Sequence, residues 1–383
     1  MNNLTLLPDK SALQGLSPRE AKWLFHHFRV NLPPVFFSEL LADLTKAKPK
    51  SATAEGDVQS LARKITSHSL STNGGAEDLM WSELHARRTP LDGRPADSRA
   101  ELLQMENGEK AIYLDATPTQ EMLDRWVAGD FSQNDRDFAR EWRDGISKIK
   151  LEETFRQSKE LRRAEVRSSH DVHKVVESVL AGRDYQLIHM LYDLAGAPSK
   201  VMSQAIIAWR KMGKPSVSEF FPYSYLILRI ELYFLIGLAN QVITTRDTNR
   251  IDIEYLKYLP FTLVFTSSDA LHMETAQHFL LGHNAFIPGA ELKQALAEIA
   301  DHWEAVDEET RKRGTATYAD LPPVNLDNVI TRLYDRYMPN WREGANKPRP
   351  PISAEESERL MKQIRPKMEE IQRLRKDPKA RLN

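Results

Sequence analysis

The chain contains no cysteine, and this absence removes several kinds of chemistry at once. Without thiols there is no disulfide framework, no thiolate metal site and no cysteine nucleophile. An excess of charge of one sign is also lacking, because 53 basic residues face 54 acidic ones and the formal net charge is -1. Such a balance creates no overall positive field, so any binding of nucleic acid must come from a local patch.

Long apolar runs are missing as well. The most apolar stretch, Tyr223 to Asn240, is interrupted by Arg229 and Glu231, whereas a membrane span needs about 18 or more consecutive apolar residues. The start of the chain has no basic segment leading into an apolar core, and Pro8 comes early. We therefore expect no membrane association and a location in the cytoplasm.

The composition is that of a globular protein, with 41% hydrophobic and 28% charged residues. At 383 residues the chain is longer than a typical domain of about 100 to 200 residues, which favours two units or one domain with a large insertion.

Four carboxylates stand out because each lies either at the end of an expected strand or in the first turn of an expected helix. Asp9 follows the apolar run that begins at Leu4, and Asp269 ends the strand-like segment from Thr262. Glu39 and Asp252 are each expected in the first turn of a helix, the former after a strand at residues 35–37. Functional side chains of open α/β sheets gather outside the carboxyl ends of the strands. The four acids are therefore expected at one sheet edge.

Carboxylates without histidine or cysteine are the protein ligands that hard cations such as Mg²⁺ and Mn²⁺ prefer. One or two such ions can activate water and neutralise a phosphodiester that is being hydrolysed. Without a cation, four converging acids would repel one another, and the pKa values of some would rise. The pattern predicts a metal-dependent nuclease with Asp9, Glu39, Asp252 and Asp269 as both metal ligands and catalytic residues.

The same residues carry a resemblance to a known family. The segment around Asp9, with Ser11 two residues later, resembles the opening strand of PIN-domain nucleases, and the segment around Glu39 resembles their second acidic motif. Asp252 resembles the third motif, and residues 266–269 resemble the closing strand. The resemblance covers residues 1–46 and 216–285. Pro8, Lys10 and an extra serine before Asp269 depart from the family pattern.

The resemblance implies a discontinuous α/β domain with three layers, α/β/α, around a central parallel sheet. Residues 47–215 would form a linker and a mostly helical insertion, and residues 286–383 a helical extension. It also implies an endonuclease whose substrate is nucleic acid, RNA more than DNA, with Mg²⁺ or Mn²⁺ as cofactor. The insertion offers a surface for a protein partner or a second copy of the chain. The alternative is a PIN-like module that binds nucleic acid or protein without cleaving.

Supporting residues are expected around the acids. Ser11 and Ser268 could hold the carboxylates or a bound water by hydrogen bonds, and Asp43 and Glu254 lie close in sequence. Histidines 272, 278 and 283 follow Asp269, and of these His278 could reach a metal or phosphate. For all of them packing or solvent exposure is the simpler interpretation.

Two rival patterns remain open. The run from Ala111 to Asp115 is another strand followed by an aspartate, with Glu153 or Glu231 as the acid between it and Asp252. The pair Arg183 and His189 resembles the catalytic pair of helical HEPN ribonucleases, but similar pairs occur at 19 and 26 and at 163 and 170. A ribonuclease of that kind would need no metal.

Overall fold

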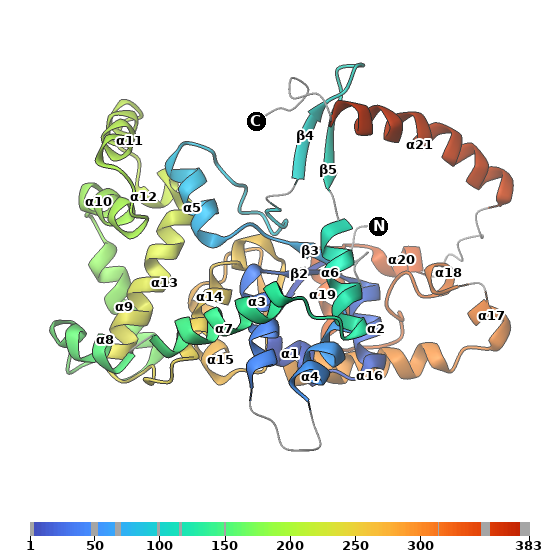
Figure 1. The fold of residues 1–383 in the computed structure, drawn as a ribbon, viewed down its shortest axis with the longest axis horizontal. Coiled ribbons are helices and arrows are strands. Elements are labelled where there is room, and N and C mark those ends of the chain that lie inside the picture. The colour runs from blue at the N-terminus through green and yellow to red at the C-terminus, as the bar shows by residue number, and fades with distance from the viewer. Residues whose placement is uncertain are drawn as a thin grey trace.

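The centre of the protein is a five-stranded parallel sheet within a mostly helical chain (Figure 1). The computed structural model describes residues 4–46, 53–65, 70–97, 100–114, 117–148, 151–312, 314–345 and 353–375. The strands are β1 (Leu4–Pro8), β2 (Phe28–Leu32), β3 (Leu70–Thr72), β6 (Val264–Ser267) and β7 (Ala285–Pro288). The expected α/β class with a central parallel sheet is confirmed.

The order of the strands reverses its direction between β1 and β6. Across the sheet the order is β3, β2, β1, β6, β7, and every neighbouring pair is parallel. The chain proceeds outward from β1 to β3, then returns to β6 and proceeds outward in the other direction. Loops that leave β1 and β6 therefore diverge, which is the arrangement that opens a site beyond the carboxyl ends of such strands.

Burial on both faces explains why β1 reads as an unbroken apolar run. Leu4, Leu6 and Leu7 are each at most 3% exposed, because parallel sheets are covered by helices on both sides. On one side α2 (Pro18–His27), α16 (Gly289–Glu304) and α19 (Val329–Tyr337) pack together. A capping box formed by Ser17 and Glu20 begins α2.

Strand β2 lies earlier than the sequence pattern predicted. The strand expected at residues 35–37 was wrong, because these residues belong to a helix. Helix α2 ends at His27, β2 occupies residues 28–32, and α3 (Pro34–Ala42) begins immediately afterwards. Pro34 occupies the first helical turn, where its missing N–H costs nothing and its fixed φ suits a helix. Glu39 consequently lies in the second turn of α3 rather than in a first turn.

The sheet also draws on segments outside residues 1–46 and 216–285. Strand β3 comes from the stretch interpreted as linker and insertion, and β7 crosses the expected boundary at residue 285. Helix α16, in the expected extension, packs against α2 and α1 (Lys10–Gly15). The α/β unit is therefore larger than the motif spacing suggested.

Helix α13 (Pro222–Ala239) is the central element of the helical part. It packs against α5 (Ala76–Leu84), α9 (Ser169–Leu180) and α10 (Asp184–Leu194). Among the described residues α13 is the one helix long and apolar enough to cross a membrane by length and composition, and 67% of it is buried inside the protein. Its apolar character is thus that of a core helix.

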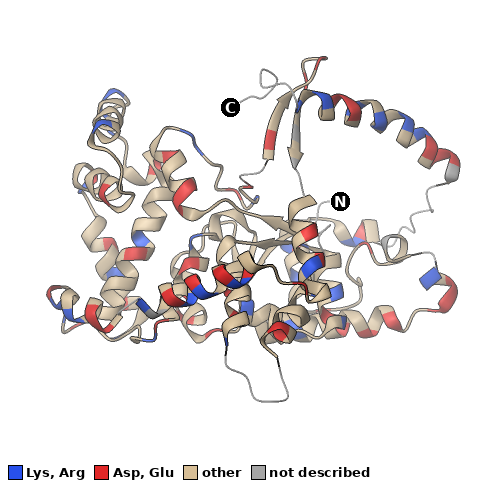
Figure 2. Ribbon diagram, viewed as in Figure 1, with Lys and Arg blue, Asp and Glu red and all other residues tan. Residues whose placement is uncertain are grey.

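The other helices complete the two parts. They are α4 (Ala54–Ala62), α6 (Thr117–Ala128), α7 (Gln133–Lys148), α8 (Leu151–Gln157), α11 (Ser199–Lys211), α12 (Val217–Phe220), α14 (Asn249–Leu256), α15 (Ala270–Thr275), α17 (Glu308–Lys312), α18 (Thr315–Tyr318), α20 (Trp341–Ala345) and α21 (Ala354–Leu374), with 3₁₀ turns at Asp43–Thr45, Ser158–Leu161, Leu259–Phe261 and Ala276–His278. Basic and acidic side chains are interspersed over most of these helices (Figure 2), in keeping with the even charge balance.

A small antiparallel hairpin, β4 (Ala100–Gln104) and β5 (Lys110–Leu114), stands apart from the main sheet. It is contacted by the exposed helix α21, through Arg373 with Glu106 and Lys367 with Glu109. Strand β5 is the strand of the rival opening motif, and here it pairs with β4 rather than with the parallel sheet. Asp115 itself lies outside the described residues.

A buried carboxylate joins α5 to the start of α13 and yields a stability prediction. Glu83 is 1% exposed and accepts hydrogen bonds from the backbone N–H groups of Tyr223 (3.0 Å) and Ser224 (2.7 Å). Glu83→Ala leaves both donors without a partner, and each such loss costs about 1 to 3 kcal/mol. We expect urea unfolding to show a loss of about 2 to 4 kcal/mol, with a smaller loss for Glu83→Gln.

The matched control is Glu77→Ala, because Glu77 is exposed on the same helix. Its effect should stay below about 1 kcal/mol. Equal losses in the Glu83 and Glu77 variants would contradict a capping role for Glu83.

Candidate active site

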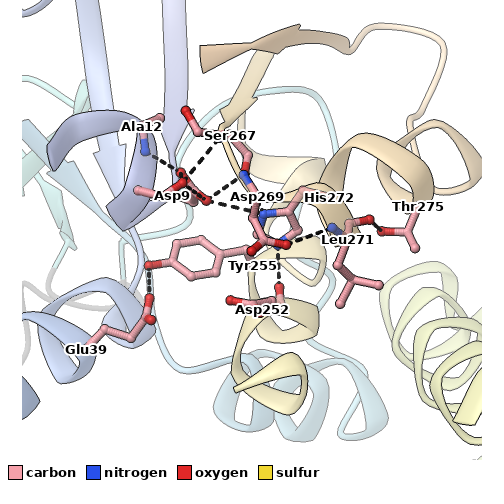
Figure 3. A network of polar contacts seen from close by, with 12 residues as sticks. Asp9, Ala12, Glu39, Asp252, Tyr255, Ser267, Asp269, Leu271, His272 and Thr275 are labelled. Carbon is pink, nitrogen blue, oxygen red and sulfur yellow. Dashed lines mark hydrogen bonds and ion pairs between the residues drawn. The ribbon is translucent and has the colours of Figure 1, made fainter. Parts of the chain in front are cut away.

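All four predicted acids come together beyond the carboxyl ends of β1 and β6. Asp9 directly follows β1, Asp269 lies two residues beyond β6, Asp252 is in the first turn of α14, and Glu39 is on α3. Figure 3 shows the four side chains around the rings of Tyr255 and His272. Residues more than 200 positions apart in sequence are thus joined through a network of hydrogen bonds.

Asp9 is buried, and its carboxylate is fully engaged by the protein. It caps α1 by accepting from Ala12 N (2.7 Å), and both of its oxygens accept from the Ser11 hydroxyl at 2.9 and 2.8 Å. Its Oδ2 also accepts from Ser267 Oγ at 2.6 Å and lies 3.4 Å from His272 Nδ1. A carboxylate has about four lone-pair positions, and these donors use them.

The hydrogen bonds of His272 are those of a ring that carries both protons when Asp9 is ionised. Nε2 lies 2.6 Å from the carbonyl oxygen of Asp252, which can only accept. Nδ1 lies 2.8 Å from Ser267 Oγ. When Asp9 is ionised its oxygens can only accept, so the proton of Ser267 goes to Asp9 and Nδ1 is the donor to that hydroxyl. His272 is therefore an imidazolium, 0% exposed, between Asp9 and α14.

The pKa values agree with this assignment. Burial by itself lowers the pKa of His272, but the hydrogen bond and charge of Asp9 outweigh it and hold the pKa above its ordinary value. Burial by itself raises the pKa of Asp9, but His272, Ser267 and the Ala12 N–H together hold it below its ordinary value. The two groups form a buried ion pair.

Asp252 is in the opposite situation, because the charges of His272 and Arg246 that favour its ionised form are outweighed. Burial, together with the nearby negative charge of Asp269, raises the pKa of Asp252 to about 7. Its Oδ2 is buried and has no hydrogen-bond partner among the described residues. Asp269 caps α15 by accepting from Leu271 N at 2.8 Å. The pair Asp252 and Asp269 therefore carries more negative charge than its surroundings neutralise.

Glu39 completes the acidic edge through Tyr255. The Tyr255 hydroxyl donates to Glu39 Oε2 at 2.5 Å. Burial raises the pKa of Glu39, and the hydrogen bond from Tyr255 opposes that rise. The ammonium of Lys10 lies beside Glu39, donating to its backbone carbonyl at 2.9 Å.

The expected supporting residues divide into two groups. Ser11 bonds Asp9 and accepts from the backbone N–H of Ser268 at 3.2 Å, so it connects the loops after β1 and β6. Asp43 is instead paired with Lys10 at 2.7 Å. Glu254 is paired with Arg250 at 2.9 Å and with Lys257 at 2.8 Å. Each of these two acids is therefore balanced by its own cations, Asp43 by Lys46 as well as by Lys10.

The carboxylates of the site differ in how well they fit a divalent cation. Within the described ranges, no three His, Cys, Asp or Glu side chains are grouped closely enough to hold a metal ion. Mg²⁺, however, commonly binds one or two carboxylates and takes its other ligands from water and substrate phosphates. Asp252 and Asp269 match that chemistry, with mutual repulsion and one unpartnered buried oxygen. Asp9 matches it less well, since its lone pairs are already used.

Sequence reasoning missed the central roles of His272 and Tyr255. His278, which was the histidine expected to reach a metal or phosphate, lies 2.6 Å from Ser169 Oγ and stacks on His173. It therefore packs against α9. His272 differs from His278 in its spacing, because it lies three residues after Asp269 and hence in the first turn of α15. That spacing was the available signal.

Comparison of the chain with protein-family models, with curated proteins and with solved structures found no match. The interpretation of the site consequently depends on its own geometry.

The raised pKa of Asp252 predicts how stability depends on pH. In the unfolded chain its pKa is close to 3.8, and in the fold it is about 7. The fold therefore retains a proton that the unfolded chain releases, so the contribution of Asp252 to the stability of the wild type should fall as the pH rises from about 4 to 7. Asp252→Asn removes this contribution. We expect the variant to gain stability over the wild type in urea unfolding at pH 8 with EDTA, and little at pH 4.5.

Asp247→Asn is the control, because Asp247 is an exposed acid just before α14. It should leave the pH profile parallel to that of the wild type. A parallel profile for Asp252→Asn as well would show that the site does not strain this carboxylate.

Proposed function

We propose that the protein is a metal-dependent nuclease with a PIN-like fold that hydrolyses phosphodiester bonds of nucleic acid, with RNA as the expected substrate. One observation supports this most: beside Asp269, where the loops after β1 and β6 diverge, Asp252 presents a buried carboxylate oxygen that has no hydrogen-bond partner in the described part of the chain. The PIN-like arrangement of three layers around the parallel sheet is part of the same proposal.

A divalent cation is the natural partner of this pair. Two carboxylates that repel each other are relieved by a hard cation that binds both. Mg²⁺ or Mn²⁺ held by Asp252 and Asp269 would supply charge neutralisation at the phosphate and a more acidic water. Glu39, on the same edge, is the further carboxylate available to such an ion or to its bound water.

The protein's own residues would position this pair. Asp9 holds the His272 imidazolium and Ser267 in place. Ser267 accepts the backbone N–H of Asp269 at 2.9 Å, and His272 donates to the backbone carbonyl of Asp252 at 2.6 Å. The buried ion pair therefore sets the position of both backbones that carry the proposed ligands. This is the kind of support by which outer residues orient metal ligands.

The proposal predicts cleavage that needs divalent metal. Purified protein given labelled single-stranded RNA and DNA should cut in Mn²⁺ or Mg²⁺ and should not cut in EDTA. Asp252→Asn and Asp269→Asn should lower the cleavage rate about a hundredfold or more, since each removes a direct ligand. Asp9→Asn should lower it roughly 10- to 100-fold, as expected when a positioning partner is lost.

Asp247→Asn serves again as the control and should cleave at the wild-type rate. Cleavage that persists in EDTA would point instead to a metal-independent ribonuclease such as the His189 pattern suggests. Cleavage unaffected by both Asp9→Asn and Asp269→Asn would place the active site elsewhere.

Cation binding can be measured without activity. Mn²⁺ should raise the thermal unfolding midpoint of the wild type, because a ligand that binds only the folded state stabilises it. The rise should be lost in Asp252→Asn and kept in Asp247→Asn. An equal rise in all three proteins would mean that Mn²⁺ binds somewhere else.

A PIN-like interaction module without catalysis is the second candidate. The observation that favours it is the His272 imidazolium, a built-in cation that already neutralises Asp9. In that case Mn²⁺ would not shift the unfolding midpoint, and no strand would be cut. Binding of nucleic acid or of a protein partner would then be the remaining function.

A further inference from the structure

A cavity of about 410 Å³ lies beside α3 and contains no charged side chain in its lining. Its walls come from α3, from the end of β3, from α6 and from α7. They consist of Pro34, Phe37, Ser38, Leu41, Thr72, Asn73, Thr119, Met122, Trp126 and Phe138. An uncharged cavity of this kind disfavours a phosphate group and suits a neutral, largely apolar one.

Aromatic rings form much of the wall. Phe37 and Trp126 contact each other with ring centroids 6.4 Å apart. Phe138, on α7, is 41% exposed and is backed by the parallel ring of Trp142, with 6.2 Å between centroids and an interplanar angle of 15°. Its ring thus has an aromatic neighbour and is still open to solvent. Such a ring is a stacking platform.

The polar side chains in the wall are mostly engaged inside the protein. Thr72 donates to Asp97 at 3.0 Å and Ser38 donates to the backbone carbonyl of Pro34 at 3.1 Å. Asn73 is bonded to the side chain of Asn31 and to the backbone N–H of Ala96. The indole nitrogen of Trp126 is buried without a partner among the described residues. A ligand in this cavity would be bound by stacking and shape complementarity, because few hydrogen-bonding groups remain to distinguish one ligand from another.

The cavity lies at the same edge of the sheet as the acids. Thr72 is the last residue of β3, and Ser38 directly precedes Glu39 on α3. Strands β3, β2 and β1 are consecutive neighbours, and strands in a sheet are about 4.8 Å apart. The end of β3 is therefore roughly 10 Å from the end of β1, a distance that a single strand of nucleic acid spans easily.

We propose that this cavity is a nucleobase subsite. It binds an unpaired base of a single strand whose phosphodiester lies at the acidic edge of the sheet. This inference rests on the proposed function, because it is the nuclease proposal that places a nucleic-acid strand at this edge. Aromatic faces stack on any base, so the subsite selects single-stranded over paired nucleic acid and tolerates different sequences.

Binding of defined strands in EDTA tests the subsite apart from cleavage. The probes are a fluorescein-labelled oligouridine of about 12 nucleotides and an abasic strand of the same length, followed by fluorescence anisotropy. Phe138→Ala should weaken binding of the oligouridine roughly tenfold or more, because stacking on one ring contributes about that much. Phe138→Trp should restore it. The abasic strand should bind weakly and equally to all variants.

Tyr185→Ala is the matched control, since Tyr185 is an aromatic residue of similar exposure (44%) on α10. It should bind the oligouridine like the wild type. Unchanged binding by Phe138→Ala, or an abasic strand that binds as tightly as the oligouridine, overturns the subsite. If the wild type and Phe138→Ala cleave alike in Mn²⁺, the nuclease stands and the subsite falls. If no protein cleaves but binding still depends on Phe138, the subsite stands and the nuclease falls.

Discussion

The ion pair between Asp9 and His272 is the interaction on which the arrangement of this edge depends. A carboxylate that is 4% exposed is costly to bury unless a partner of opposite charge and hydrogen-bond donors accompany it. His272 supplies the charge, and its second nitrogen binds the backbone of α14. The end of β1, the loop after β6 and the start of α14 are thereby fixed to one another.

This arrangement leaves the rest of the acidic edge with an imbalance. His272 carries one positive charge and is engaged by Asp9, so Asp252 and Asp269 must share a half-buried region without a dedicated cation. The elevated pKa of Asp252 is the physical consequence. The charges of Asp9 and His272 balance each other, whereas those of Asp252 and Asp269 repel. A balanced pair that positions an unbalanced one is the pattern expected of a preorganised binding site. The proposed cation would correct the imbalance, and the proposed base subsite, which is uncharged, would contribute affinity without adding to it.

Much of the site could be predicted from the sequence, because its signals are local. The apolar run before Asp9 and the strand-like segment before Asp269 both predicted strands whose ends carry the acids. Strand β2 could not be assigned correctly, because residues 28–32 follow a helix without a glycine or proline break and their burial depends on pairing with β1 and β3. Strand β3 has only three residues, too few for a periodic pattern.

What the sequence by itself determined is therefore the α/β class and the four acids as a group. Only the tertiary structure decided how those acids are used. The hydrogen bond from Ser267 to Asp9 joins residues 258 positions apart, and the ionisation of His272 follows from its neighbours at the end of β1 and on α14. Charge and proton positions depend on distance and burial in three dimensions, and no spacing along the chain contains that information for partners so remote.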